Sequence, residues 1–298
     1  MRPPSPSLPE KDFLLAALAQ ARRIDGRALL DMRTPLLAFG TDLGNVECAL
    51  GKTRVLAQVD AKMVRPPPER PYEGLVSIHA EISPMAAPEY EQGRPSDEEV
   101  ALARMLDKVV RRSDTIDKES LCVLAGQRVW HLRLTIHCLA DAGNLLDCAC
   151  LAALVALRHF RRPDVEVVGD EVTVHPPTSR APVPLAMHHT PFCLTFAYYP
   201  SPSPPSTTTT TTAPSASSAP TCLLDPTSLE QRLAHGTLSL ALTAQRELCV
   251  VHKAGGLPLA VADVLRAVDV ACARAAALER LVEARLAEDW AARAVEVR

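Results

Sequence analysis

The chain has 298 residues, a length that suits two structural units of about 150 residues each or one larger unit. Hydrophobic residues make up 47% and charged residues 22%, close to the globular averages of roughly 45–50% and 25%, so the composition excludes wholesale disorder. The 32 basic and 35 acidic residues give a net charge of −3, which excludes the bulk basicity of proteins that bind nucleic acid over their whole surface. Any contact with RNA or DNA therefore has to be a local patch.

The sequence indicates no membrane span, secretory signal or metal site. The longest strongly apolar stretch, residues 148–157, is well short of the roughly 20 residues that cross a bilayer. The N-terminal region lacks both the basic residues before an apolar run and the small-residue cleavage site of a secretory signal. The nine cysteines include no Cys-x-x-Cys pair, which predicts buried free thiols in a reducing compartment rather than zinc ligands.

The first half of the chain reads as a short helix followed by half-buried strands. Apolar residues are spaced for one helical face over 10–23. Strict alternation predicts strands over 55–63, 76–82 and 130–136. Between the second and third of these, Ser96 and Glu99 have the Ser-x-x-Glu form of a capping box, which predicts a helix that continues to about Arg112.

The second half repeats the alternation of strands and helices. A helix over 145–160 is apolar nearly all round, which predicts burial between layers. Residues 200–220 are mostly Pro, Ser, Thr and Ala, which predicts a disordered loop. The other predicted elements are a hairpin at Gly169-Asp170, a strand over 185–198, a helix with Asp225 as cap and Pro226 as first residue, strands over 238–242 and 248–252, and a helix over 262–290. This order predicts an α+β layered fold with an internal duplication.

Asp141-Ala142-Gly143-Asn144 lies between a strand and the start of the buried helix. Free backbone N–H groups and the helix dipole at such a turn can bind a phosphate. The signal is weak, because the turn has one glycine and no Lys or Arg, and an ordinary strand-to-helix turn with Asp or Asn capping is favoured. The run from Lys253 to Gly256 offers the same choice, and a tight turn is again favoured.

Four cations are spaced to share one face of the helix that begins after Ser96, namely Arg104, Lys108, Arg111 and Arg112. They can form an anion-binding stripe, or a solvated face whose last residues offset the helix dipole. His188 and His189 would point to opposite sides of a strand and so could not readily ligate one metal. The residues alone therefore predict no metal site and no cofactor.

Several longer runs resemble the ribonuclease PH family. They are Arg-Ile-Asp-Gly-Arg at 23–27, Phe-Gly-Thr-Asp at 39–42, Leu-Gly-Lys-Thr-Arg-Val-Leu at 50–56, Met-Ala-Ala-Pro at 85–88, and residues 117–122, 147–160, 161–165 and 169–173. Within the family, the later runs are most similar to ring subunits of the eukaryotic RNA exosome of the polymyositis/scleroderma-autoantigen type. The resemblance covers about residues 10–290 and implies the ribonuclease PH fold, in which two βαβ-type halves form a layered sandwich.

The resemblance also implies how the chain is divided. A helical extension would occupy residues 1–22, and the first part of the ribonuclease PH-like domain would occupy residues 23–199. The disordered Pro/Ser/Thr insert would follow at 200–220. Residues 221–298 would form the remainder of the domain with its C-terminal helix.

The groups used for catalysis in active relatives are expected to be absent. Those relatives follow the Asp-Gly-Gly turn with Thr-Arg or Ser-Arg, which hold the attacking phosphate. Here Asp141 and Gly143 are followed by Asn144 and Leu145, and leucine cannot bind an anion. The relatives also carry a general acid just before a strand that starts Pro-Leu-Ala-Met, where this chain has Pro182. The resemblance thus implies a non-catalytic ring subunit, and the alternative is a phosphate-dependent 3′ exoribonuclease whose site is completed by a partner.

The partners are implied in the same way. They are single-stranded RNA, related ribonuclease PH-like subunits in a hexameric ring, cap subunits and an associated ribonuclease, without a membrane. The implied role is 3′-to-5′ RNA processing and degradation, including that of rRNA, in the nucleus, nucleolus and cytoplasm. In such rings this region's arginines face a channel threaded by RNA, and phosphate contacts need only positive charge. RNA contact is therefore expected for Arg111 and Arg112, with Arg104 and Lys108 behind them.

Overall fold

The computed structural model describes residues 6–91, 93, 95–169, 171–176, 179–200 and 220–293. Its first half contains α1 (Leu8–Ala19), β1 (Pro35–Phe39), β2 (Asn45–Leu50), β3 (Thr53–Val64), β4 (Leu75–Ile82), α2 (Asp97–Leu106), the π-helical turn η1 (Asp107–Arg112), the 3₁₀ turn η2 (Glu119–Leu121), β5 (Cys122–Leu124), β6 (Arg128–Ala140) and α3 (Leu145–His159). The second half contains β7 (Arg161–Arg162), β8 (Val165–Val168), β9 (Glu171–Val174), β10 (Val183–Pro184), β11 (Phe192–Tyr199), β12 (Thr221–Leu224), α4 (Ser228–Leu233), β13 (Gly236–Leu242), β14 (Leu248–Lys253) and α5 (Val261–Arg293).

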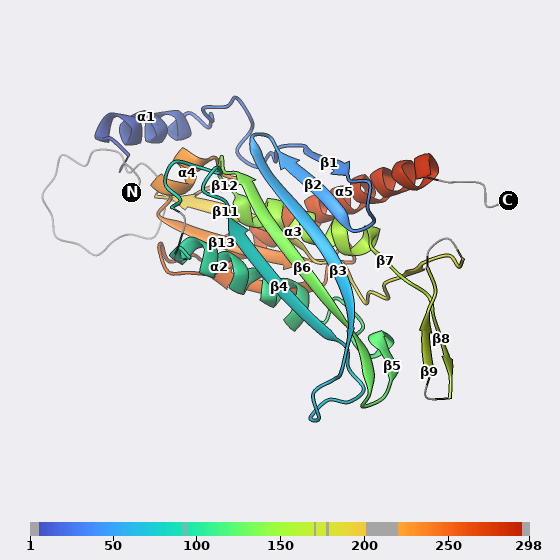
Figure 1. Ribbon diagram of the computed structural model, residues 1–298. Coiled ribbons are helices and arrows are strands. Elements are labelled where there is room, and N and C mark those ends of the chain that lie inside the picture. The colour runs from blue at the N-terminus through green and yellow to red at the C-terminus, as the bar shows by residue number, and fades with distance from the viewer. Residues whose placement is uncertain are drawn as a thin grey trace, which may run out of the picture.

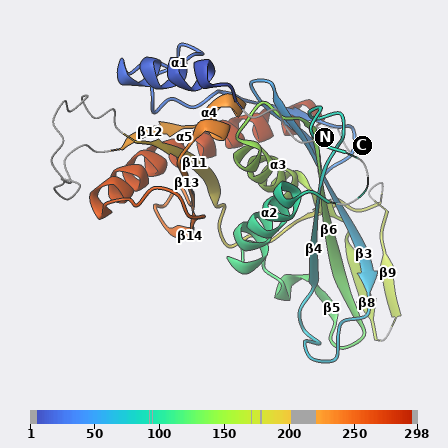
Figure 2. The same ribbon diagram turned by 90° about the vertical axis from the view of Figure 1, so that its left-hand side faces the viewer.

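Two sheets and their helices stack as layers (Figures 1 and 2). The first sheet has the order β1-β2-β3-β6-β4, with β5 also paired to β6, and the second has the order β12-β11-β13-β14. In the first sheet β4 runs parallel to β6, and the chain between them includes α2. In the second, β12 and β13 are both antiparallel to β11, so they run parallel to each other on either side of it, and α4 connects them. Each half thus contains a βαβ crossover, which confirms the predicted fold.

The central layer is α3, which contacts β2 and β3 of the first sheet and β11 of the second. Twelve of its 15 residues are buried, because the helix has a sheet on two sides. The outer face of the second sheet is covered by α5, whose buried residues recur every three or four positions from Ala267 to Leu286. Lying between α3 and α5, β11 is buried along its whole length.

Most predicted elements are present. The three alternating strands are β3, β4 and β6, the hairpin at Gly169 is β8–β9, and the last helix is α5. The helix predicted over 10–23 is α1, which packs through Leu14 and Leu18 against Tyr199 and Leu223 at one end of the second sheet. The disordered loop predicted over 200–220 lies, for residues 201–219, outside the described part of the chain.

Two predictions in the second half were wrong. The strand expected over 185–198 is instead an irregular segment over 185–191 followed by β11, which begins at Phe192. His188 and His189 lie in that segment, where the His188 N–H donates to the Thr115 carbonyl at 3.0 Å, so their expected placement on a strand does not hold. The helix expected at Asp225-Pro226 begins later, at Ser228, where Thr227 and Glu230 form a reciprocal capping box.

All nine cysteines lie in the described part of the chain and are free thiols, five of them buried. Burial raises the pKa of the Cys138 thiol to about 12, which keeps it protonated and unreactive. Within the described residues, no helix is both long and apolar enough to span a bilayer, and no group of three or more His, Cys, Asp or Glu side chains is arranged to hold a metal ion.

Candidate functional site

The turn between β6 and α3 is shaped by two residues with positive φ. Gly143 has φ +92° and Asn144, the N-cap of α3, has φ 57°. A Cβ atom at Gly143 would collide with the backbone of Thr227 and Ser228. Only glycine combines this backbone conformation with such a close approach. The turn therefore packs directly against the backbone at the start of α4.

The N–H groups expected to cradle a phosphate already have acceptors within the protein. Ala142 N–H donates to Thr53 Oγ1 at 3.2 Å, Gly143 N–H to Asp141 Oδ1 at 2.8 Å, and Asn144 N–H to Gln231 Oε1 at 2.9 Å. An anion at these groups would have to displace each acceptor. The geometry is therefore that of a strand-to-helix turn whose N–H groups are occupied by side chains of β3 and α4, distant in sequence, and not that of an open phosphate cradle.

Negative charge also surrounds the turn. The Tyr90 hydroxyl lies 2.9 Å from Asp141 Oδ2 and 2.8 Å from Glu98 Oε2. Burial, together with these carboxylates, raises the pKa of Tyr90 far above its usual value. Two carboxylates close together repel a third anion. Both this repulsion and the occupied N–H groups therefore disfavour a phosphate at the turn.

Leu145 and Pro182 are the other two positions where the catalytic groups of active relatives are expected to be absent. Neither side chain supplies a group that could bind phosphate. Leu145 is partly buried and packs against the hydrophobic core. Pro182 precedes β10, where Val183 pairs with Arg162 and lines a small cleft with Trp130, near the start of β6. Asp141 follows the other end of that strand, roughly 30 Å away at about 3.3 Å per residue. The structure therefore does not bring Pro182 to the turn, and the two halves of the predicted site are separate.

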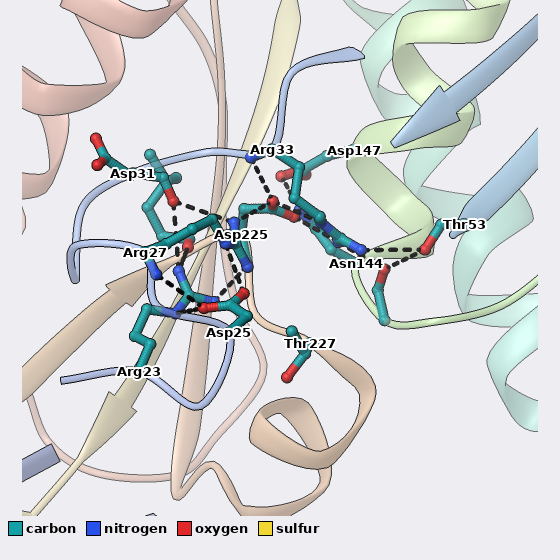
Figure 3. Close-up of polar contacts among 12 residues, drawn as sticks. Arg23, Asp25, Arg27, Asp31, Arg33, Thr53, Asn144, Asp147, Asp225 and Thr227 are labelled. Carbon is teal, nitrogen blue, oxygen red and sulfur yellow. Dashed lines mark hydrogen bonds and ion pairs between the residues drawn. The ribbon is translucent and has the colours of Figure 1, made fainter. Parts of the chain in front are cut away.

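A buried ionic network behind the turn was missed by the sequence analysis (Figure 3). Asp225, with a side chain that is 0% exposed, accepts hydrogen bonds from Arg27 Nη1 at 2.7 Å, Arg33 Nη2 at 2.7 Å and Asn144 Nδ2 at 2.7 Å. Burial opposes ionisation of Asp225, but the hydrogen bonds and charge of Arg33, with the Asn144 amide, outweigh it and lower the pKa. This network joins the segment before β1 to both α3 and the second half.

Asp147 is the other buried carboxylate of the network, and it lies without a cationic partner among the described residues. It accepts from Asn144 Nδ2, from the Thr195 N–H and from Thr195 Oγ1, each at 2.8 Å. Burial raises the pKa of Asp147 to about 7, although these three donors act in the opposite direction. Asn144 Nδ2 thus bridges the two acids Asp147 and Asp225.

The four basic residues of the predicted stripe lie on α2 and on the turn η1 that follows it. Ser96 caps this helix through the Glu99 N–H at 3.2 Å, as predicted, but the α-helix ends at Leu106 and continues as the π turn η1. Since a π turn has i→i+5 geometry, the spacing that would align the four cations is lost.

The four cations consequently line two clefts rather than one face. Arg104 and Lys108 line a cleft of about 730 Å³ beside β4 and β14, and Arg111 lines a second cleft of about 520 Å³. Arg112 borders both. Three of the four cations, Arg104, Lys108 and Arg112, thus share one cleft, and Arg111 lies in the neighbouring one.

The second cleft contains two cations that sequence reasoning missed, Arg70 and Lys118. Asp107 pairs with Arg111 at 2.5 Å and with Arg112 at 3.2 Å, while their side chains remain 50% and 68% exposed. Lys118 pairs with Asp114 at 2.5 Å and Arg70 with Glu73 at 3.1 Å. Such exposed pairs are weak and exchange readily for another anion. Prolines on either side of Arg70 were the available signal, since they mark an exposed loop.

The chain matches two family models, the 3′ exoribonuclease family domain 1 over residues 31–163 and domain 2 over residues 219–274. It is 37% identical to the exosome complex component rrp45 of Schizosaccharomyces pombe, over 95% of this chain and 91% of that protein. It is 41% identical to the human exosome complex component RRP45, over 94% of this chain but only 60% of the human protein.

Solved structures show the same fold. A chain of the Archaeoglobus fulgidus exosome with RNA bound to the active site superposes with a TM-score of 0.73 at 25% identity, covering 91% of this chain and 96% of that one. A chain of an archaeal exosome core gives 0.68 at 23% identity, covering 92% and 96%.

Proposed function

Because the chain belongs to the 3′ exoribonuclease family of the ribonuclease PH type, we propose that it is a non-catalytic ring subunit of an RNA exosome core. In this role it supports 3′-to-5′ RNA processing and degradation and contributes to the channel through which RNA is threaded. The similarity to exosome components along nearly the whole chain supports the assignment to the ring.

The single observation that supports the lack of catalysis is the filled turn before α3. Its three N–H groups donate to Thr53, Asp141 and Gln231. Leu145 supplies no cation, and Asp141 and Glu98 add negative charge. An attacking phosphate would meet repulsion instead of donors at this position.

The open edges of the two sheets support assembly with related subunits. β4 ends the first sheet and β14 ends the second, and within the described residues no strand pairs with their outer edges. Leu248 and Val251 on β14 are 47% and 53% exposed. Exposed edges and apolar side chains of this kind are normally covered by a partner. The proposed partners are related subunits of a hexameric ring, cap subunits and an associated ribonuclease, in the nucleus, nucleolus and cytoplasm.

The two basic clefts are the proposed RNA contacts. Arg111, Arg112, Arg70 and Lys118 around the second cleft would hold backbone phosphates, with Arg104 and Lys108 behind them. The cations around the second cleft are paired at the surface with Asp107, Asp114 and Glu73, and a phosphate can replace such surface pairs at little cost.

The test of the proposed lack of activity is a phosphorolysis assay. The full chain, alone and co-purified with a ribonuclease PH-like partner, is incubated with 3′-labelled single-stranded RNA, inorganic phosphate and Mg²⁺, with an active family member as positive control. We expect no nucleoside diphosphate above background. Release that disappears in an Asp141→Asn variant would support the alternative, a phosphate-dependent exoribonuclease with a shared site.

Co-purification tests the ring assignment separately. Co-expression with a related subunit should give a soluble 1:1 heterodimer, measured by light scattering. A well-behaved monomer with no affinity for any ribonuclease PH-like subunit would contradict the assignment.

A further inference from the structure

A third cleft, of about 570 Å³, lies between the C-terminal half of α5 and the irregular segment that precedes β11. Its walls combine the apolar side chains of Leu185, Met187 and Leu286 with charged and polar ones. Arg161 of β7 and Trp290 of α5 line the same cleft, and Figure 1 shows β7 close to the C-terminal half of α5.

Arg161 is the outer member of a row of planar groups in contact, whose rings are tilted by 50° and 48° to one another. Phe39 and His159 lie with their ring centroids 4.9 Å apart, His159 and Trp290 5.6 Å apart, and the Arg161 guanidinium lies 4.5 Å from the Trp290 centroid. His159 is fixed from both sides, because the Gly44 N–H donates to its Nδ1 at 3.1 Å and its Nε2 lies 3.1 Å from Asp289. The guanidinium is therefore held in a set orientation by cation–π contact on a rigid base.

The charge of Arg161 is not balanced within the described chain. Within the described residues its guanidinium donates only from Nη1, to the carbonyl oxygens of Arg158 and Phe160 at 3.0 and 3.2 Å, and no carboxylate pairs with it. The neighbouring Arg158 differs, because it pairs with Glu279 at 2.7 Å. A planar guanidinium fixed on one face and open at its edge is suited to bind a carboxylate through two hydrogen bonds.

We propose that this cleft binds a short segment of a protein partner in which an acidic side chain is next to an apolar one. The acid would pair with Arg161, and the apolar side chain would lie against Leu185, Met187 and Leu286. A protein segment is favoured over RNA because Glu279 and Glu283 both pair with Arg158 in the cleft, which leaves Arg161 as its one Arg or Lys without a carboxylate partner among the described residues. One such cation suits a single acid beside an apolar group, whereas successive phosphates of a nucleic acid need several cations.

The probe is an array of labelled octapeptides in a Gly-Ser background. Each carries Asp or Glu next to Leu, Ile, Met or Phe, and each has matched controls with Asn or Gln for the acid and Ser for the apolar residue. Binding to the full chain is measured by fluorescence polarisation. We expect saturable binding by a subset of the acidic-apolar peptides and at least tenfold weaker binding by both control sets.

Three variants locate the binding. Arg161→Ala should weaken it at least tenfold, whereas Arg285→Ala, which removes an exposed cation of α5 outside the cleft, should leave it unchanged. Ala287 is exposed at the cleft, so Ala287→Arg should block binding without disturbing the core. This keeps the proposal testable if Arg161→Ala lowers the melting temperature.

Several outcomes would overturn the proposal. They are no binding by any acidic-apolar peptide, equal binding by the neutral controls, or no effect of Ala287→Arg. Oligouridylate binding that is lost in Arg161→Ala would reassign the cleft to RNA. Loss of heterodimer formation in the same variant would reassign it to the ring interface.

Discussion

The turn before α3 and the surface of η1 both place polar and charged groups at a helix end, but they use them in opposite ways. At the turn, the N–H groups and the Asn144 Nδ2 amide donate to acceptors from β3, α4 and the loop before it. On η1, one partly buried acid, Asp107, is shared by the exposed side chains of Arg111 and Arg112. Polar and charged groups therefore stabilise the fold where they are buried and paired, and they remain available to a ligand where they are exposed.

The largest loss of stability is expected from Asp225→Ala, which removes the shared acceptor of the buried network. Arg27, Arg33 and Asn144 would lose a shared buried partner, and removing one member of a buried ionic network costs about 3–5 kcal/mol. Urea unfolding measures the loss. Asp107→Ala is the matched control on η1 and should cost less than about 1 kcal/mol. Equal losses would contradict the distinction between the two regions.

Gly143→Ala should have the next largest effect. The added Cβ would meet the backbone of Thr227 and Ser228 at a residue with φ +92°, and strain plus overpacking together cost about 2–4 kcal/mol. Gly126 has φ +73° with no atom near its Cβ position, so Gly126→Ala reports the backbone cost alone, about 1 kcal/mol. If the melting temperature falls equally in the two variants, the contact of the turn with Thr227 and Ser228 is not the cause of the lost stability.

The two buried carboxylates should affect stability with opposite dependence on pH. The pKa of Asp147 is raised to about 7 in the folded chain, so folding binds a proton and its contribution to stability falls as the pH rises from about 4 to 7, by up to about 1.4 kcal/mol per pH unit. The pKa of Asp225 is lowered, so its contribution is present above its unfolded pKa and is lost as the pH falls through its lower folded pKa.

Asp147→Asn isolates the first of these effects. The Asn oxygen can accept from Asn144 and the Thr195 N–H, while its amide donates to the Thr195 hydroxyl, which in turn can donate to Ser239. The free energy of unfolding of this variant, relative to the unmodified chain, should therefore rise between pH 5 and pH 7. A difference that is constant over this range would show that Asp147 stays ionised throughout.

The smallest effect on folding is expected from Arg111→Glu with Arg112→Glu. Stability should fall by only about 0.3–1 kcal/mol per residue, from the helix dipole, plus repulsion by Asp107. RNA affinity of the assembled ring should fall, and each lost phosphate contact should reduce the slope of log affinity against log salt by roughly 0.7. Filter binding at several salt concentrations measures this. Arg280→Glu with Arg285→Glu on α5 is the control, and an equal loss of affinity there would indicate general charge repulsion.

The fold could be predicted largely because its signals are local. Alternation placed β3 and β6, and Ser96 marked the start of α2. The candidate site could be predicted only in part. Asp225 reads as a helix cap because Pro226 follows it, yet its real partners, Arg27 and Arg33, come from almost 200 residues earlier in the chain. Local pattern cannot reveal such a partner, nor the π turn that separates Arg111 from Arg104, because tertiary packing decides both.

The same long-range pairing has a consequence for synthesis on the ribosome. Arg33 and Asp225 are separated by 192 positions, so the segment before β1 cannot be anchored until the second half has been made. At about 5–20 residues per second, that interval is roughly 10–40 s. During this time the first sheet would have formed without its final connection, and its β4 edge and the apolar surface of α3 would be open to nascent-chain chaperones. Ribosome-bound intermediates stalled before residue 225 should therefore be sensitive to proteolysis in the segment around Arg27, and protection should appear only once Asp225 has emerged.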